Sequence, residues 1–171
     1  MKQKIFKCGL IGGVILFIWS AASWMLFPMY TNQFHTFSNE ESVQSTISAN
    51  APVSGLYTVP AMGNCSKNGP YLFAAIKTEG MNCSMTGAMA SALAVRIVAA
   101  IIVAALLFQT KLKFKKSVLF ITAIGFLLGM VGVMPLVIWF GFPGMYAFVS
   151  IFESVVGWFL AGLGMSKLAR R

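Results

Sequence analysis

The feature that most constrains this chain is a set of four long, nearly continuous apolar runs. They cover about residues 8–28, 87–109, 117–141 and 144–166. A bilayer has a hydrocarbon core about 30 Å thick and needs about 20 apolar residues to cross it as a helix. Backbone polar groups find no water there, so runs of this length must be helices. The sequence therefore predicts an all-α membrane protein with four transmembrane helices, surrounded by a lipid bilayer.

Composition agrees with this prediction. Of the 171 residues, 58% are hydrophobic and only 10% are charged. Soluble globular domains are about one quarter charged, so this chain does not have the composition of one. We expect a single membrane domain over residues 1–171, interrupted only by a loop at 29–86.

Most basic residues lie at the borders of the apolar runs. Three segments hold ten of the thirteen: Lys2, Lys4 and Lys7; Lys111, Lys113, Lys115 and Lys116; and Lys167, Arg170 and Arg171. With four spans, these segments share one side of the membrane, which the positive-inside rule makes cytoplasmic. Both termini are then expected in the cytoplasm and the 29–86 loop outside. The net charge of +9 is read as a topology signal, so no nucleic-acid partner is expected. The stretch KLKFKK also suits anionic lipid headgroups.

The first apolar run has a second interpretation, as a signal peptide. It follows the basic segment MKQKIFK, and the small residues of WSAAS resemble a cleavage site. However, the run continues through WMLFPMY, longer than a signal peptide requires, and cleavage would remove a span that the charge pattern needs. We therefore expect an uncleaved anchor.

The 29–86 loop is predicted to be a small α/β-like periplasmic element between the first two spans. Ser38 and Glu41 have capping-box spacing, Val43 and Ile47 share a helical face, and Pro52 would end the helix. The stretches SGLYTVP and YLFAAIKTE are strand-like and predict a hairpin. This element is expected either to pack on the outer helix ends or to insert between the helices.

Three cysteines bear on compartment and chemistry. Cys65 and Cys83 both lie in the loop, where an oxidising environment favours a disulfide between them, and Cys8 lies in the first span. Closing that loop is worth about 3 kcal/mol in the chain-entropy model. The alternative is a redox role like that of small four-helix thiol oxidoreductases, which use a C-x-x-C pair that this chain lacks.

No catalytic constellation is recognisable in the sequence. The single histidine, His35, has Glu40 and Glu41 nearby but no further ligands at metal-site spacing. The glycines of GLIGG fall within a span instead of after a strand, so they indicate close helix packing and not a phosphate loop. We therefore expect no enzyme activity, no metal and no cofactor.

Two charges lie deep within the apolar runs. Arg96 is fifteen residues from Lys111, about 22 Å along a helix, and Glu153 is fourteen residues from Lys167, about 21 Å. Both helices run toward the cytoplasm, so the two charges share a depth. A lone charge near the bilayer centre costs about 2.5–3.5 kcal/mol on insertion scales, which favours pairing. We predict that Arg96 and Glu153 meet, either as a closed structural ion pair or as the polar wall of a cavity.

The first half of the chain also resembles a known group of proteins. The stretches GLIGGVILFIWSAASWMLFP, FSNEESVQSTISANAPVSGLYTVP and GPYLFAAIK are similar to small bacterial inner-membrane proteins of uncharacterised function, which share a glycine-rich first helix and a loop of the form NE..V...I..NAP.SG.Y..P. The resemblance implies a bacterial origin and a multi-pass location in the inner membrane. It implies no activity and no functional residues.

Two functional classes follow. The first is a non-enzymatic envelope protein that is structural or binds a membrane-protein partner. The second is a small transporter or channel-like component, as a homo-oligomer, that uses Arg96 and Glu153 in a cavity. A water-accessible cavity at the level of these two residues favours the second class, and a dry, closed pair favours the first.

Overall fold

The structure is a computed structural model that describes residues 2–61, 63–64, 69–81 and 84–169. It divides into two compact units. Residues Met1–Gln33 and Ser84–Arg171 form the membrane unit, and residues Phe34–Cys83 form the loop unit. The loop thus folds as a compact unit of its own within the predicted single membrane domain.

The membrane unit contains four long helices, each long and apolar enough to cross a membrane. They are α1 (Lys2–Leu26), α4 (Met85–Gln109), α5 (Phe114–Phe140) and α6 (Gly144–Ala169), and a single turn, α2 (Pro28–Thr31), follows α1. The predicted four-helix membrane fold is confirmed. The helices extend beyond three of the four apolar runs at the lysine-bearing end, because polar border residues continue the helical hydrogen bonding.

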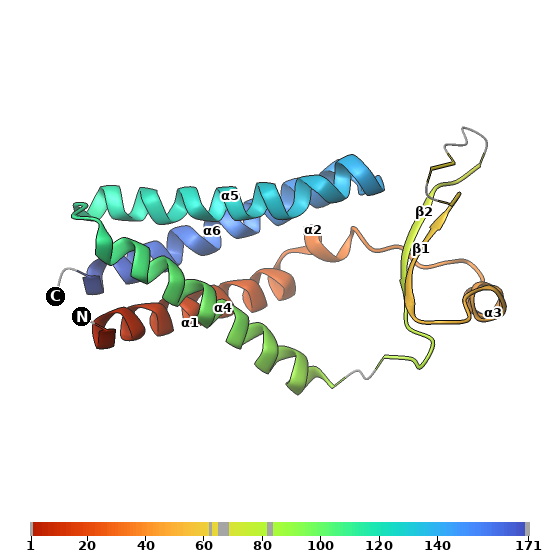
Figure 1. The fold of residues 1–171 in the computed structure, drawn as a ribbon, viewed down its shortest axis with the longest axis horizontal. Helices are drawn as coiled ribbons and strands as arrows, with labels where there is room; N and C mark the ends of the chain where they lie inside the picture. The colour runs from red at the N-terminus through yellow and green to blue at the C-terminus, as the bar shows by residue number, and fades with distance from the viewer. Residues whose placement is uncertain (1, 62, 65–68, 82–83, 170–171) are drawn as a thin grey trace. The chain divides into compact units, whose positions relative to one another are not determined.

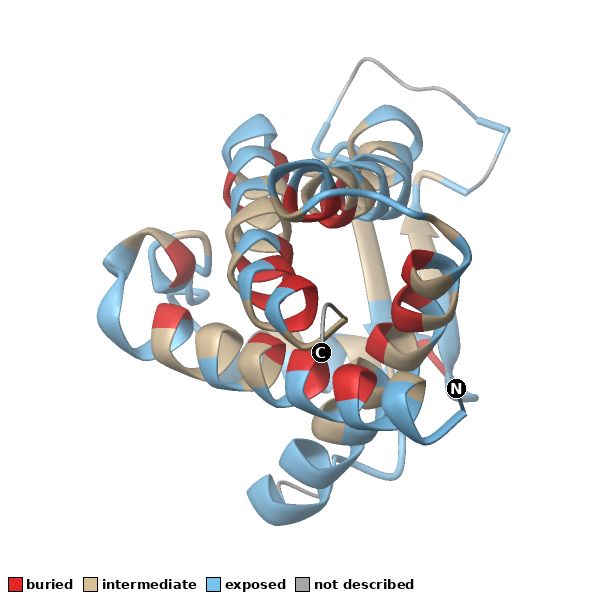
Figure 2. Ribbon diagram, turned by 90° about the vertical axis from the view of Figure 1, so that its left-hand side faces the viewer, coloured by how far each residue is buried: buried red, intermediate tan, exposed pale blue. Residues whose placement is uncertain are grey.

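The long helices pack in the order α4, α1, α6, α5. Extensive contacts join α1 to α4, α1 to α6 and α5 to α6, whereas α4 makes few contacts with α5 or α6 (Figure 1). Figure 2 shows the buried residues on helix sides that face their neighbours. They form one apolar core: Cys8, Leu16, Ala100, Val103, Ala104, Leu107, Ile121, Trp158, Ala161 and Met165. Because α4 and α5 scarcely touch, the space between them is not sealed by direct helix packing.

Glycines of the GLIGG stretch bring α1 and α4 together; close helix packing is predicted from the sequence, and the structure identifies α4 as the partner helix. A Cβ atom on Gly9 would lie 2.5 Å from the Cα of Ile101, and one on Gly13 would lie 2.5 Å from the Cα of Ile97. Only a residue without a side chain permits this backbone approach. The contact sets the rotation of α1 and therefore decides which α1 side chains face α4 and α6.

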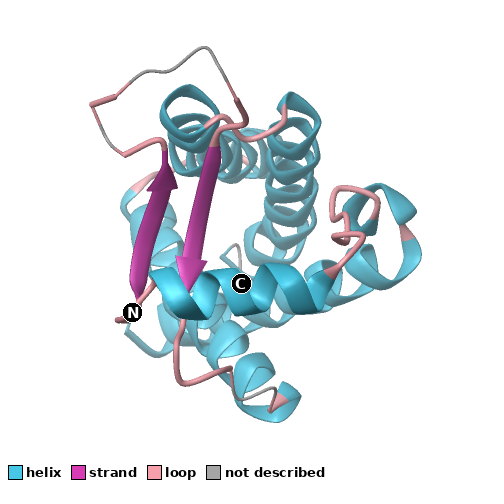
Figure 3. Cartoon of the chain, turned by 90° about the vertical axis from the view of Figure 1, so that its right-hand side faces the viewer, coloured by secondary structure: helices cyan, strands magenta, loops and turns pink. Residues whose placement is uncertain are grey.

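The loop unit consists of α3 (Glu40–Asn50) and an antiparallel hairpin of β1 (Gly55–Val59) and β2 (Leu72–Ile76) (Figure 3). The predicted helix and hairpin are therefore confirmed. The predicted cap is shifted by one residue: the side chain of Asn39, not Ser38, accepts a hydrogen bond from the Ser42 amide, at 2.9 Å. Glu40 thus starts the helix.

Candidate functional site

The membrane unit brings Arg96 of α4 and Glu153 of α6 to opposite sides of one hydroxyl group. The Nη2 group of Arg96 donates to Oγ of Ser20 at 2.6 Å, and this hydroxyl donates to Oε1 of Glu153 at 2.7 Å. In the part of the chain that the structure describes, the two charged groups have no direct ion pair, and Ser20 of α1 joins them instead. We call these three residues the Ser20 triad.

Two further hydrogen bonds fix the triad in place. The Nη1 group of Arg96 donates to the carbonyl of Ala92 one turn earlier on α4, at 3.2 Å. The indole Nε1 of Trp19 donates to the backbone carbonyl of Glu153, at 3.1 Å. Trp19 thus binds the backbone of Glu153, and its neighbour Ser20 binds the Glu153 side chain. The helix α1 therefore positions the carboxylate.

Both charged residues of the triad have hydrogen-bonding atoms without a partner among the described residues. A guanidinium carries five N–H donors, and only two of those on Arg96 have acceptors among the described residues. Likewise, Glu153 accepts through Oε1, while its Oε2 has no donor in the described part of the chain. Unpaired polar groups are expensive in an apolar medium, so water or a solute bound at these atoms would stabilise them.

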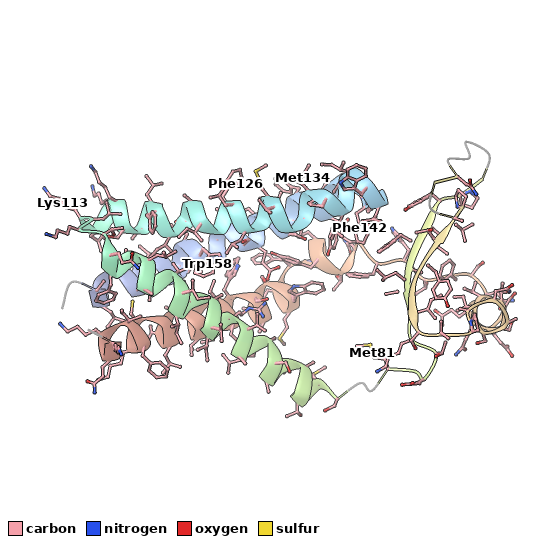
Figure 4. All side chains as sticks on the ribbon, in the orientation of Figure 1. Met81, Lys113, Phe126, Met134, Phe142 and Trp158 are labelled. Carbon is pink, nitrogen blue, oxygen red and sulfur yellow. The ribbon has the colours of Figure 1, made fainter. Side chains whose placement is uncertain are left out.

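A cavity of about 300 Å³ adjoins the triad and is lined by all four long helices. Its polar wall comprises Ser20, Arg96, Ser150, Glu153 and Ser154, and its remaining wall comprises Leu16, Trp19, Val95, Ala99, Leu128, Gly157 and Trp158. Trp158, labelled in Figure 4, belongs to α6 and is part of this wall. The cavity therefore combines one cation, one anion and several hydroxyls with a broad apolar surface.

A second cavity, of about 510 Å³, lies between the later part of α1 and the earlier part of α4. It shares Ser20 and Arg96 with the first cavity, and Arg96 is the only charged residue in its lining. The other lining residues are Phe17, Ala21, Trp24, Met25, Met85, Ala88, Met89 and Ala92. Arg96 therefore stands between a polar cavity and an apolar one.

Tyr30 is a further polar residue near this site. Its side chain is buried, and its hydroxyl has no hydrogen-bond partner among the described residues. Burial raises the pKa of the Tyr30 phenol above its usual value of 10.0; the nearby Ser23 hydroxyl lowers it, although that hydroxyl donates its proton to the Ser20 carbonyl and not to Tyr30; and the negative charge of Glu153 raises it. The phenol is therefore neutral at physiological pH and adds no third charge to the site.

Neither Cys8 nor His35, which the sequence also singles out, lines the cavity. Cys65 and Cys83 fall outside the described residues, and Cys8 is a buried free thiol beside the Met165 carbonyl. His35 lines a groove of about 560 Å³ within the loop unit, together with residues of α3 and the segment after β2. Within the described ranges, no three His, Cys, Asp or Glu side chains gather into a metal-binding group.

No sequence pattern singles out Ser20, the residue that joins the two charges. The stretch WSAAS that contains Ser20 resembles a cleavage site, and a hydroxyl within an apolar span is itself only a weak signal. This signal is not specific, because the sequence does not show whether such a hydroxyl faces a charge or bonds to its own helix backbone.

Comparison of the chain with protein families, curated proteins and solved structures gave no match. The chemical character of the site therefore rests on its own geometry.

Proposed function

We propose that the protein is a small transporter or channel-like component that binds a solute at the Ser20 triad. The observation that carries this proposal is the cavity of about 300 Å³ bounded by Arg96 and Glu153. At about 30 Å³ per water molecule, it has room for about ten waters or a small solute. Intramembrane charges that face a cavity commonly mark the path of a substrate or ion, which supports this proposal.

The form of the charge pairing supports binding over a purely structural role. Buried ion pairs that only fix packing gain most from direct, bidentate contacts that satisfy every donor and acceptor. In the triad, one hydroxyl separates the charges, and Arg96 and Glu153 retain unused hydrogen-bonding atoms beside the cavity. A solute can therefore bind without first breaking a direct ion pair.

We place the protein in a bacterial inner membrane, with both termini in the cytoplasm. The distribution of lysines and arginines supports this orientation, and the resemblance of the first eighty residues supports the compartment. The cavity then lies nearer the outer than the cytoplasmic face, because Glu153 is nine residues from the start of α6 and sixteen from its end.

A second candidate function is binding of a partner protein in the envelope. The loop-unit groove of about 560 Å³, lined by residues such as Val43, Ile47 and Ile76, favours it. Its mixed wall, with Glu40 and Lys77 beside these apolar residues, suits a peptide segment. The two functions are compatible, since they use different units.

Cysteine accessibility in lipid vesicles tests the first proposal. Ser150 lines the cavity, whereas Phe148, two residues earlier on α6, is 63% exposed and does not line it. A small, net-neutral, membrane-impermeant thiol reagent should modify Ser150→Cys above the wild-type background. The matched Phe148→Cys should stay unmodified, because lipid would surround it. Equal protection of both cysteines would show a dry site and refute the proposal.

A further inference from the structure

We infer that the solute bound at the Ser20 triad is a small zwitterion, of the class of α-amino acids with an apolar side chain. The inference rests on the proposed function and names its ligand. It follows from the charge balance of the site, the spacing of its charges, their unused hydrogen-bonding atoms and the character of the remaining wall.

The charge balance excludes most solutes that carry a net charge. Among the described residues, Arg96 and Glu153 are the only charged ones that line the cavity, and their formal charges cancel. A solute with a net charge would add an uncompensated charge to an apolar environment, at a large desolvation cost. A zwitterion is neutral overall, so it avoids that cost and still offers both ends to the site.

The spacing of the two charges matches a compact zwitterion. Both Nη2 of Arg96 and Oε1 of Glu153 bind the same Ser20 oxygen, at 2.6 and 2.7 Å. The two charged groups are therefore at most two hydrogen-bond lengths apart. In an α-amino acid one carbon atom links the carboxylate carbon to the ammonium nitrogen, so both ends of the ligand reach their partners together.

The unused atoms of the triad have the right polarity for each end. Arg96 has N–H donors beyond those given to Ser20 and Ala92, and a guanidinium binds a carboxylate through paired N–H groups. The Oε2 atom of Glu153 is available to accept from an ammonium group. The ligand would thus satisfy the groups that the described residues leave unpaired.

The rest of the cavity wall defines the remainder of the ligand. Leu16, Val95 and Leu128 present aliphatic surface beside Trp19 and Trp158. A volume of about 300 Å³ is at the lower limit of ligand pockets, so it admits a single small molecule and not a peptide. An aliphatic side chain on the zwitterion would fill this part of the cavity.

A set of matched probes tests the inference on the wild-type protein in phosphatidylcholine nanodiscs. L-leucine carries both charges, 4-methylpentanoate carries only the carboxylate, and 3-methylbutylamine carries only the ammonium. A ligand that binds the folded state raises Tm. L-leucine should raise Tm at concentrations where neither single-charge analogue does. An equal rise with either analogue, or no rise with L-leucine, would overturn the inference.

Variants then assign the response to the triad. Arg96→Gln and Glu153→Gln should each weaken L-leucine binding about tenfold or more, since each removes a charged hydrogen-bond partner. Thr122→Ala is the control, because the Thr122 hydroxyl donates to Val118 within α5 and lies outside the cavity lining. Unchanged binding in both charge variants would contradict the assignment. The probe series on the wild type stands even if a variant fails to fold.

The two proposals fail in different ways. If Ser150→Cys is modified but L-leucine gives no selective rise in Tm, the proposed solute-binding function is retained and the proposed zwitterionic ligand is rejected. If Ser150→Cys and Phe148→Cys are both protected, the proposed solute-binding function is rejected, and the proposed ligand is rejected with it.

Discussion

The Oγ atom of Ser20 lies 2.7 Å from Oε1 of Glu153, and this hydrogen bond connects the first helix to the charge on the last. The same hydroxyl accepts from Arg96. One serine thus links three of the four long helices, since it belongs to α1, Glu153 to α6 and Arg96 to α4. Its small side chain determines the separation of two intramembrane charges.

Replacing Ser20 by alanine should destabilise the protein. Arg96 and Glu153 would each lose a hydrogen bond. In soluble proteins a hydrogen bond to a charged group contributes about 1.5–3 kcal/mol to the free energy of unfolding. Intramembrane measurements average lower, at about 0.6 kcal/mol, so we expect a loss of about 1–3 kcal/mol in the free energy of unfolding. Titration with a denaturing detergent, followed by circular dichroism, measures it. Thr122→Ala, which loses only a bond within its own helix, should change stability much less, and equal losses would contradict the role of Ser20.

The glycine contacts between α1 and α4 give a second prediction. Gly9→Ala and Gly13→Ala would each place a methyl group 2.5 Å from the α4 backbone, so α1 and α4 must separate. Overpacking of this kind costs about 1–3 kcal/mol. The same unfolding titration should show this loss.

Gly132→Ala on α5 is the control for these variants, because a Cβ there has no neighbour within 4 Å. It should be neutral or raise stability by up to about 1 kcal/mol through better helix propensity. If Gly9→Ala and Gly13→Ala behave like Gly132→Ala, the close approach of α1 and α4 is not required.

The four spans could be predicted from the sequence because long apolar runs have only one stable backbone arrangement in lipid. Helix ends were less predictable. The helix α1 starts at Lys2 because a polar residue at the membrane border can remain helical without lengthening the apolar run. The cap of α3 is Asn39 and not the predicted Ser38. Serine and asparagine are both good caps, and only the path of the backbone selects one of them.

The role of Ser20 could not be predicted, because a hydroxyl in an apolar helix usually bonds to its own backbone. Ser23 and Thr122 do so, donating to the carbonyls of Ser20 and Val118. Whether a serine faces a charge depends on the rotation of its helix. For α1, the contacts of Gly9 and Gly13 set that rotation, and these are long-range contacts that a single sequence does not reveal.

The loop unit gives a third prediction, at the start of α3. Asn39→Ala removes the side chain that caps the Ser42 amide, and loss of such a cap costs about 1 kcal/mol. Amide hydrogen exchange on the full-length protein should show lower protection in the first turn of α3. Ser38→Ala is the neighbouring control and should leave that protection unchanged. A greater loss of amide protection in Ser38→Ala than in Asn39→Ala would show that Ser38, the cap predicted from the sequence spacing, is the true cap.

Tyr30 gives the last prediction. Its buried hydroxyl has no hydrogen-bond partner among the described residues, so Tyr30→Phe removes an unsatisfied polar atom and keeps the ring contact with Trp24, whose centroid lies 5.5 Å away. Stability at neutral pH should stay the same or rise by about 1 kcal/mol. The two proteins should differ most at alkaline pH. Because the folded state raises the pKa of Tyr30 above 10.0, it holds the proton more tightly than the unfolded chain. The wild type should therefore lose stability relative to Tyr30→Phe as the pH rises past about 10, and parallel curves for the two proteins would contradict the burial of this hydroxyl.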